Sequence, residues 1–169
     1  MLTGRRVVLG VTGGIAAYKA ADLASRLVKA GAQVRVVMTE NARRFVAPLT
    51  FEALTGQKAA FDAFERAFEI EHVALAKWAE LFIVAPATAN FLGKYAGGIA
   101  DDLLTSVAMA MPCPALIAPA MNTAMYRAPA TQDNLALLAR RGARFVGPES
   151  GRLACGDDDV GRMSEPAAI

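Results

Sequence analysis

The stretch RRVVLGVTGGIAAYKAADLASRLVKAG, residues 5–31, decides the fold class. It begins with a short apolar run, passes through a glycine-rich turn and continues as an amphipathic segment that ends at Gly31. Glycine is a common helix stop, and apolar residues recur in this segment with helical spacing. We therefore expect a strand, a tight turn and a helix whose buried face carries Ala17, Ala20, Leu23, Ala24, Leu27 and Val28.

Four further short apolar runs follow, at residues 32–38, 81–85, 115–118 and 143–147. They are rich in Val and Ile and are separated by longer helix-compatible stretches, a pattern typical of βα repeats around a parallel sheet. The sequence therefore predicts an α/β fold, with a doubly wound parallel sheet in a single domain over residues 1–169.

Two of the intervening stretches contain helix breakers. Residues 41–56 look helical, and Pro48 either kinks this helix or starts a second one. Gly97 and Gly98 are expected to divide residues 88–111 into two helical pieces.

Composition excludes several classes of function. The 169 residues include 18 Lys plus Arg and 16 Asp plus Glu, and a net charge of +2 gives no electrostatic footprint for nucleic acid or for an anionic membrane. Hydrophobic residues make up 54% of the chain, yet prolines interrupt the apolar runs before they reach the length of a membrane span. This apolarity favours strands buried on both faces and a large subunit interface.

The cysteines and the N-terminal run favour a cytoplasmic protein. Cys113 and Cys155 occur in unlike contexts without a CxxC motif, so reduced thiols are expected. With one His in the chain, a zinc site would have too few soft ligands. Residues 1–11 have too short an apolar run for a signal peptide.

The glycine-rich turn at residues 10–20, GVTGGIAAYKA, is a candidate phosphate site. Glycines let the backbone approach a ligand closely, and the free amides of a helix N-terminus attract anions. The turn matches neither GxGxxG nor the GK[ST] ending of a P-loop, so a plain strand-to-helix connection remains an alternative.

Two other candidate sites follow predicted strands. Thr88 and Asn90 come after the third strand and could bind a planar heterocycle or its ribityl chain, or Thr88 could merely cap a helix. Asn122 comes after the fourth strand, between Met121 and Met125, and its amide could pair with a substrate carboxylate or amide. Methionines in such positions are more often core residues than ligand contacts.

The last candidates are His72 and the segment GRLACGDDDVGRM, residues 151–163, which we call the flap. A lone His is more often structural than catalytic, although it titrates near neutral pH. The flap glycines suit a mobile segment, and Cys155 could act in it as a thiol acid or nucleophile. The alternative is an acidic tail with an incidental cysteine, whereas a calcium loop would need a different spacing of carboxylates.

Together these segments resemble the homo-oligomeric flavin-containing cysteine decarboxylases over nearly the whole chain. The resemblance rests on a single central His and on GVTGGIAAYK, APATANFLGKYAGGIADDLLT, PAMN at 119–122, LACG and GRM. It implies a Rossmann-like, flavodoxin-like fold that binds FMN at a subunit contact and assembles trimers, commonly four of them in a dodecamer. In the most similar branch the implied reaction converts 4'-phosphopantothenoylcysteine into 4'-phosphopantetheine and carbon dioxide, in coenzyme A biosynthesis.

The resemblance also implies roles for individual residues. In this family the cysteine thiol is first oxidised to a thioaldehyde, which then accepts the electrons left by carbon dioxide. His72 would act in the oxidation and decarboxylation, Asn122 and Met125 would bind substrate, and Cys155 would protonate the enethiolate that remains. The implied FMN contacts are Gly13, Gly14, Ile15, Thr39, Thr88, Ala89, Asn90, Phe91 and Ala120.

One letter of the flap departs from the family pattern, because Asp159 stands where a glycine is usual. Aspartate tolerates a left-handed backbone better than most residues, so we expect a similar turn at a modest cost. The family's decarboxylase is often fused to the ligase that makes its substrate, and a chain ending at Ile169 is expected to be either an excised domain or a stand-alone enzyme. The functional alternatives are a flavin prenyltransferase, a peptidyl-cysteine decarboxylase, an FMN electron carrier and a catalytically inactive regulatory subunit.

Overall fold

The computed structural model describes residues 2–62, 70–152, 156 and 158–169. Five parallel strands form its main sheet in the order β2-β1-β3-β4-β5. From β1 the chain passes to β2 on one side and then to β3 on the other, so the order reverses beside β1. This is the flavodoxin-like order, which confirms the predicted doubly wound fold. The strands are β1 (Arg6–Val11), β2 (Gln33–Met38), β3 (Leu81–Ala87), β4 (Ala115–Pro119) and β5 (Arg144–Phe145).

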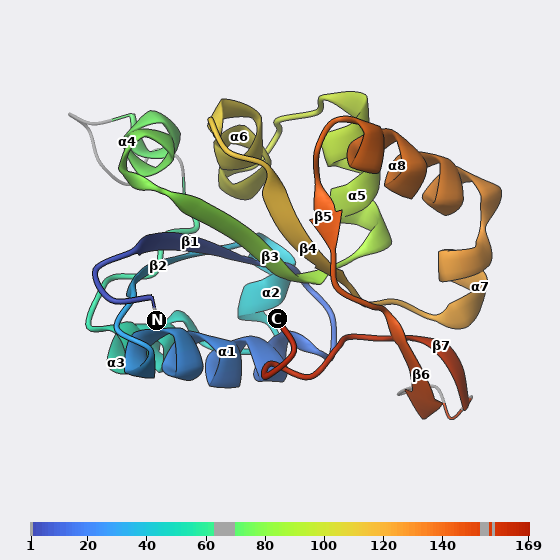
Figure 1. Ribbon diagram of the computed structural model, residues 1–169, viewed down its shortest axis with the longest axis horizontal. Helices are drawn as coiled ribbons and strands as arrows, with labels where there is room; N and C mark the ends of the chain where they lie inside the picture. Colours follow the sequence, from blue (N-terminus) through green and yellow to red (C-terminus); the bar gives the residue numbers. More distant parts are fainter. Residues whose placement is uncertain (1, 63–69, 153–155, 157) are drawn as a thin grey trace.

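Helices cover both faces of this sheet (Figure 1). The helices on one face are α1 (Ala17–Lys29) and α3 (Pro48–Thr55), with the short α2 (Glu40–Arg43) after β2. The helices on the other face are α4 (Glu71–Trp78), α5 (Ala89–Gly97), α6 (Leu103–Ala110) and α8 (Pro129–Arg140), and the short α7 (Thr123–Arg127) precedes α8. No helix among the described residues is long and apolar enough to cross a membrane.

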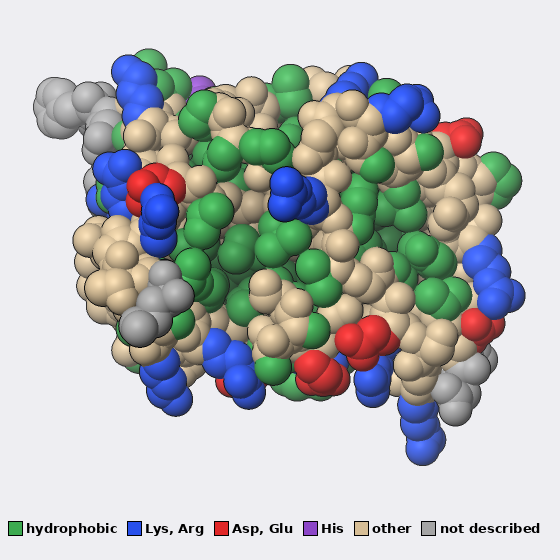
Figure 2. All heavy atoms as spheres, viewed as in Figure 1, with side chains coloured by type: hydrophobic (Ala, Val, Ile, Leu, Met, Phe, Trp, Pro, Cys, Tyr) green, Lys and Arg blue, Asp and Glu red, His purple; other side chains and the backbone are tan. Residues whose placement is uncertain are grey.

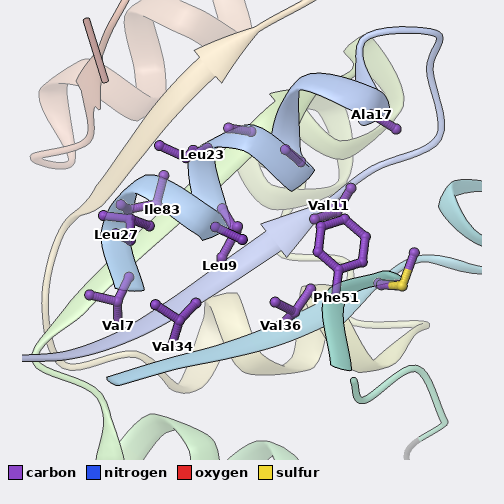
Figure 3. Close-up of a cluster of buried hydrophobic side chains, with 14 of the residues drawn as sticks. Val7, Leu9, Val11, Ala17, Leu23, Leu27, Val34, Val36, Phe51 and Ile83 are labelled. Carbon is purple, nitrogen blue, oxygen red and sulfur yellow. The ribbon is translucent and has the colours of Figure 1, made fainter. Parts of the chain in front are cut away.

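Alternate residues of each central strand enter two separate hydrophobic clusters. Val7, Leu9 and Val11 of β1 face α1, and Figure 3 shows them with Leu23 and Phe51. Val8 belongs to the cluster on the opposite face. Side chains of a strand alternate between faces, so burial of both sets requires helices on both sides. Each large aliphatic side chain buried in this way contributes about 1.5–3 kcal/mol.

The structure settles the predicted helix breaks. Pro48 is the first residue of α3 and does not kink a longer helix. Proline suits this position, because its ring fixes φ near the helical value and the first turn does not need its missing N–H group. Gly97 ends α5, and Gly98 follows in the left-handed conformation with φ 71°. The predicted division of this segment is confirmed.

The flap and the two residues before it form a feature that sequence periodicity did not predict, an antiparallel hairpin of β6 (Glu149–Arg152) and β7 (Asp158–Arg162). Its strands carry few apolar residues, so they lack the alternation that identifies a half-buried strand. In Figure 1 the hairpin projects from the main body below α7.

Candidate functional site

A large cavity lies where the connections after β1, β2, β3 and β4 meet. Its volume is about 1290 Å³, and the connections contribute Gly13, Thr39, Thr88 and Ala120 to its wall. Ligands of open α/β sheets bind beyond the carboxyl ends of the strands, where the strand order reverses. Typical small-molecule pockets measure about 300–1,000 Å³, so this cavity has room for a cofactor and a substrate together.

The turn between β1 and α1 forms a cradle for an anionic group. The backbone N–H groups of Gly13, Gly14 and Ile15 donate to no acceptor among the described residues. They precede the first turn of α1, where the helix dipole favours negative charge. A side chain at Gly13 would collide with Asn41, so only glycine permits this close approach of the turn to α2. The cradle therefore fits a phosphate group.

Thr12 joins the cradle to the connection after β3. Its buried hydroxyl donates to Pro86 O at 2.7 Å and accepts a hydrogen bond from Thr88 N at 3.1 Å. Thr88 Oγ1 in turn accepts from Phe91 N at 3.4 Å at the start of α5. Thr88 thus caps α5, as one of the two interpretations predicts, and it also lines the cavity, so binding of a ligand by Thr88 stays a prediction.

The PAMN segment and the β6–β7 hairpin pack against each other at the cavity. Met121 N donates to Gly161 O at 3.0 Å, and Thr123 Oγ1 donates to Val160 O at 2.7 Å. Asn122 starts α7, with Oδ1 accepting from Ala124 N at 2.8 Å. These contacts place the hairpin beside the residue expected to bind substrate.

Ion pairs fix several charged side chains in the cavity wall. The buried Lys19 donates from Nζ to Met163 O at 3.0 Å and to Glu165 Oε1 at 2.8 Å, which ties the segment after β7 to α1. Lys94 Nζ lies 2.8 Å from Asp101 Oδ1. This hydrogen bond raises the pKa of Lys94 and lowers the pKa of Asp101, so both remain charged at neutral pH.

Most of the predicted site residues line this one cavity. They are Gly13, Gly14, Ile15, Thr39, Thr88, Ala89, Asn90, Phe91, Ala120, Asn122 and Met125. His72 does not line it, because it lies in the first turn of α4, at the opposite end of the molecule from the β6–β7 hairpin (Figure 1). Cys155 lies outside the described residues.

The cavity wall also contains residues that the sequence did not single out. Asn41, Lys94, Asp101, Arg152 and Arg162 are among them. Their positions offered a partial signal, because Lys94 and Asp101 lie in the segment matched to the family and both arginines lie in or beside β6–β7. Nothing in local spacing indicates which charged side chains turn inward.

The sequence model of the Flavoprotein family matches residues 1–169, which is the whole chain. The chain belongs to the Flavoprotein family. Within that family it is 52% identical to the coenzyme A biosynthesis bifunctional protein CoaBC of Bacillus subtilis (strain 168), over 171 aligned residues. The alignment covers 100% of this chain and 42% of that protein, so the chain spans less than half the length of its bifunctional relatives.

Two solved structures show the same architecture. A PPC decarboxylase mutant in complex with pantothenoylaminoethenethiol superposes with a TM-score of 0.87 at 34% identity, covering 97% of this chain and 93% of that one. The FMN-dependent cysteine decarboxylase SpaF superposes with a TM-score of 0.85 at 37% identity, covering 99% and 95% of the two chains.

Proposed function

We propose that this chain is an FMN-dependent decarboxylase that converts 4'-phosphopantothenoylcysteine into 4'-phosphopantetheine and carbon dioxide, in coenzyme A biosynthesis. The observation that carries the proposal is the joining of the Gly13–Gly14 cradle, the Thr88 connection and Asn122 in one cavity large enough for two ligands. The resemblance to CoaBC and to PPC decarboxylase supports this substrate.

The cradle would hold FMN through its phosphate. Gly13, Gly14 and Ile15 would donate backbone N–H groups to that phosphate, with Thr39 beside it. The remaining FMN contacts would come from Thr88, Ala89, Asn90, Phe91 and Ala120. Bound FMN would supply the two-electron oxidation of the substrate thiol and the matching reduction at the end, so the net reaction needs no external electron acceptor.

The protein's own side chains would bind the substrate and move protons. Asn122 would hold the carboxylate through its side-chain amide, beside Met125. Once the carbon bearing sulfur is a thioaldehyde, the carboxylate on the neighbouring carbon can leave as carbon dioxide, because the thiocarbonyl accepts the bonding electron pair. Cys155 would then donate the proton that the resulting enethiolate needs.

His72 would act in the cavity of a neighbouring copy of the chain. It lies outside the cavity of its own chain, yet the family resemblance assigns it to the oxidation and decarboxylation. Large exposed apolar side chains include Ile15, Tyr18 and Met125 at the cavity and Ile70 two residues before His72. Figure 2 shows further hydrophobic side chains gathered over the middle of one face. A trimer, and four trimers in a dodecamer, would bury such surfaces.

We further propose a cytoplasmic enzyme that works with a phosphopantothenate–cysteine ligase, either fused to this chain or separate. The bifunctional character of the CoaBC relatives supports that association.

The test is an assay of the purified FMN-loaded protein with 4'-phosphopantothenoylcysteine. We expect carbon dioxide release and a product with the mass of 4'-phosphopantetheine. A flavin that stays bleached after substrate is added, with no carbon dioxide, would instead support an electron carrier. Turnover of a C-terminal peptidyl cysteine, without turnover of the phosphorylated substrate, would support a peptide decarboxylase.

A further inference from the structure

The charged side chains of the cavity wall are paired with one another or with close neighbours, and Arg152 is the exception. Lys94 is paired with Asp101 and Asp102. Lys19 is paired with Glu165. Arg162 is paired with Glu149 and Glu165, and Glu40 is paired with Arg43. Among the side chains that the structure describes, none forms a hydrogen bond or an ion pair with the guanidinium of Arg152.

The position of Arg152 suits a ligand that is longer than the reacting group. It is the last residue of β6, its side chain is exposed, and it lines the cavity at the end occupied by the hairpin. It stands three positions before Cys155 in the sequence, and three residues of fully extended chain span at most about 10 Å. The long arginine side chain adds to that reach, so its guanidinium can contact a substrate group well away from the reacting carbon.

The unpaired cation calls for an anion, and two phosphates belong to the proposed reaction. The FMN phosphate would occupy the Gly13–Gly14 cradle, where backbone N–H groups bind it without a cation. The 4'-phosphate of the substrate has no such cradle, and the other cavity cations already have carboxylate partners. Arginine binds phosphate with two parallel hydrogen bonds. Arg162 already donates to Glu149, so part of its guanidinium is not available for a phosphate.

We propose that Arg152 binds the 4'-phosphate of the substrate and makes the enzyme selective for phosphorylated pantothenoylcysteine. This inference rests on the proposed function, because it names the group that recognises the substrate of that same cavity. Charge-assisted hydrogen bonds of this kind change affinity by about 10- to 100-fold.

The test compares two substrates, 4'-phosphopantothenoylcysteine and pantothenoylcysteine, which lacks the phosphate. The measured quantity is the kcat/KM for the phosphorylated substrate divided by the kcat/KM for the unphosphorylated one, in the full FMN-loaded protein. We expect a ratio well above one for the natural chain and a ratio reduced at least tenfold in Arg152→Ala, mainly through a higher KM for the phosphorylated substrate. Arg152→Lys should retain part of the preference, because a lysine keeps the charge and loses the paired hydrogen bonds.

The matched control is Arg140→Ala. Arg140 is also exposed and has no ion pair among the described residues, but it lies in α8 and does not line the cavity. This variant makes the same change of charge and should keep the natural substrate ratio. An Arg152→Ala ratio equal to that of Arg140→Ala would overturn the assignment.

Two further outcomes separate the possible failures. If Arg152→Ala weakens FMN binding and leaves the substrate ratio unchanged, Arg152 serves the cofactor phosphate and the proposal is wrong. If the natural chain releases carbon dioxide from neither substrate, the proposed function fails and the assignment fails with it. If carbon dioxide is released from both substrates and all variants have the same substrate ratio, the proposed function stands and only the assignment of Arg152 is overturned.

Discussion

Asp159 of β7 and Arg127 of α7 form an ion pair, with Arg127 Nη2 lying 2.9 Å from Asp159 Oδ2. Asp159 Oδ1 also accepts from its neighbour Val160 N at 2.7 Å. The expected left-handed turn at Asp159 is wrong, because positive φ angles among the described residues occur at glycines alone. Asp159 instead lies in a strand, where its carboxylate connects the hairpin to the helix that Asn122 begins.

Removing this ion pair should weaken turnover while changing stability little. Exposed pairs contribute at most about 1 kcal/mol, so Asp159→Asn is expected to lower kcat/KM roughly two- to fivefold. Arg127→Ala should have a similar effect, and the double variant should be no worse than either single one. The measurement is a double-mutant cycle on kcat/KM, repeated at roughly 0.5 M salt, where screening should shrink the coupling.

Asp133→Asn is the control for this cycle, because Asp133 is exposed on α8 and has no partner among the described residues. It should leave kcat/KM unchanged at both salt concentrations. Fully additive effects of Asp159→Asn and Arg127→Ala would contradict a functional connection between hairpin and helix.

Gly161→Ala should disrupt the site more strongly than a change of backbone preference alone. Gly161 has φ 143°, and a methyl group there would collide with the carbonyl oxygen of Met121. Gly56 also has a positive φ, of 67°, but no atom lies within 4 Å of a methyl group added there. Gly56→Ala should therefore cost about 1–2 kcal/mol of unfolding free energy with turnover intact.

Thermal unfolding and turnover of the two glycine variants separate strain from collision. We expect Gly161→Ala to lose at least tenfold in kcat/KM, because the hairpin must move away from Met121. Equal behaviour of the two variants would show that the Met121 contact is unimportant.

Mixed oligomers should reveal whether His72 serves a neighbouring chain. His72→Ala and Asn122→Ala should each be nearly inactive alone. If each active cavity combines Asn122 of one chain with His72 of the next, random mixing restores about a quarter of the sites in a symmetric oligomer. The measurement is carbon dioxide release after the two variants are unfolded and refolded together.

Separately refolded samples combined afterwards are the control for that experiment, and they should stay inactive unless subunits exchange. No recovery in the co-refolded sample, with oligomers of normal size, would mean that both residues act within one chain.

Cys113 should be a slow thiol at neutral pH. Burial raises its pKa above the ordinary value of 9.0. In the folded Cys155→Ser variant, Cys113 should react with a disulfide reagent more slowly than free cysteine at pH 8. Its rate should rise with pH through and beyond 9.0, because the thiolate is the reactive form. Denatured protein supplies the reference rate. If folded protein reacted at that rate at pH 7, the prediction would be contradicted.

The sequence predicted the parts of the molecule that follow from burial and backbone geometry. Val7 and Leu9 alternate with Val8 because β1 is covered on both faces, and that alternation can be read without a structure. The turn at Gly13 before α1 was predicted as well, and its place ahead of that helix explains why its backbone N–H has no acceptor among the described residues.

The remaining features depend on contacts between distant segments. The β6–β7 hairpin is held by polar pairs such as Arg162 with Glu149 and by its docking on Met121, so no hydrophobic period indicates it. The position of His72 relative to the cavity, and the choice of Arg152 as the unpaired cation, depend on the folded arrangement of charges. These are properties of pairs of residues, and single-residue patterns do not encode them.

The hydroxyl of Thr12 has a thermodynamic consequence for ligand binding. Because it donates to Pro86 O and accepts from Thr88 N, two of the connections that surround the cofactor cradle are already held together before anything binds. A phosphate that binds in the cradle, as proposed, would therefore cost little conformational entropy. The empty and the loaded protein should accordingly share the same cradle, and any adjustment to a ligand is expected in the β6–β7 hairpin.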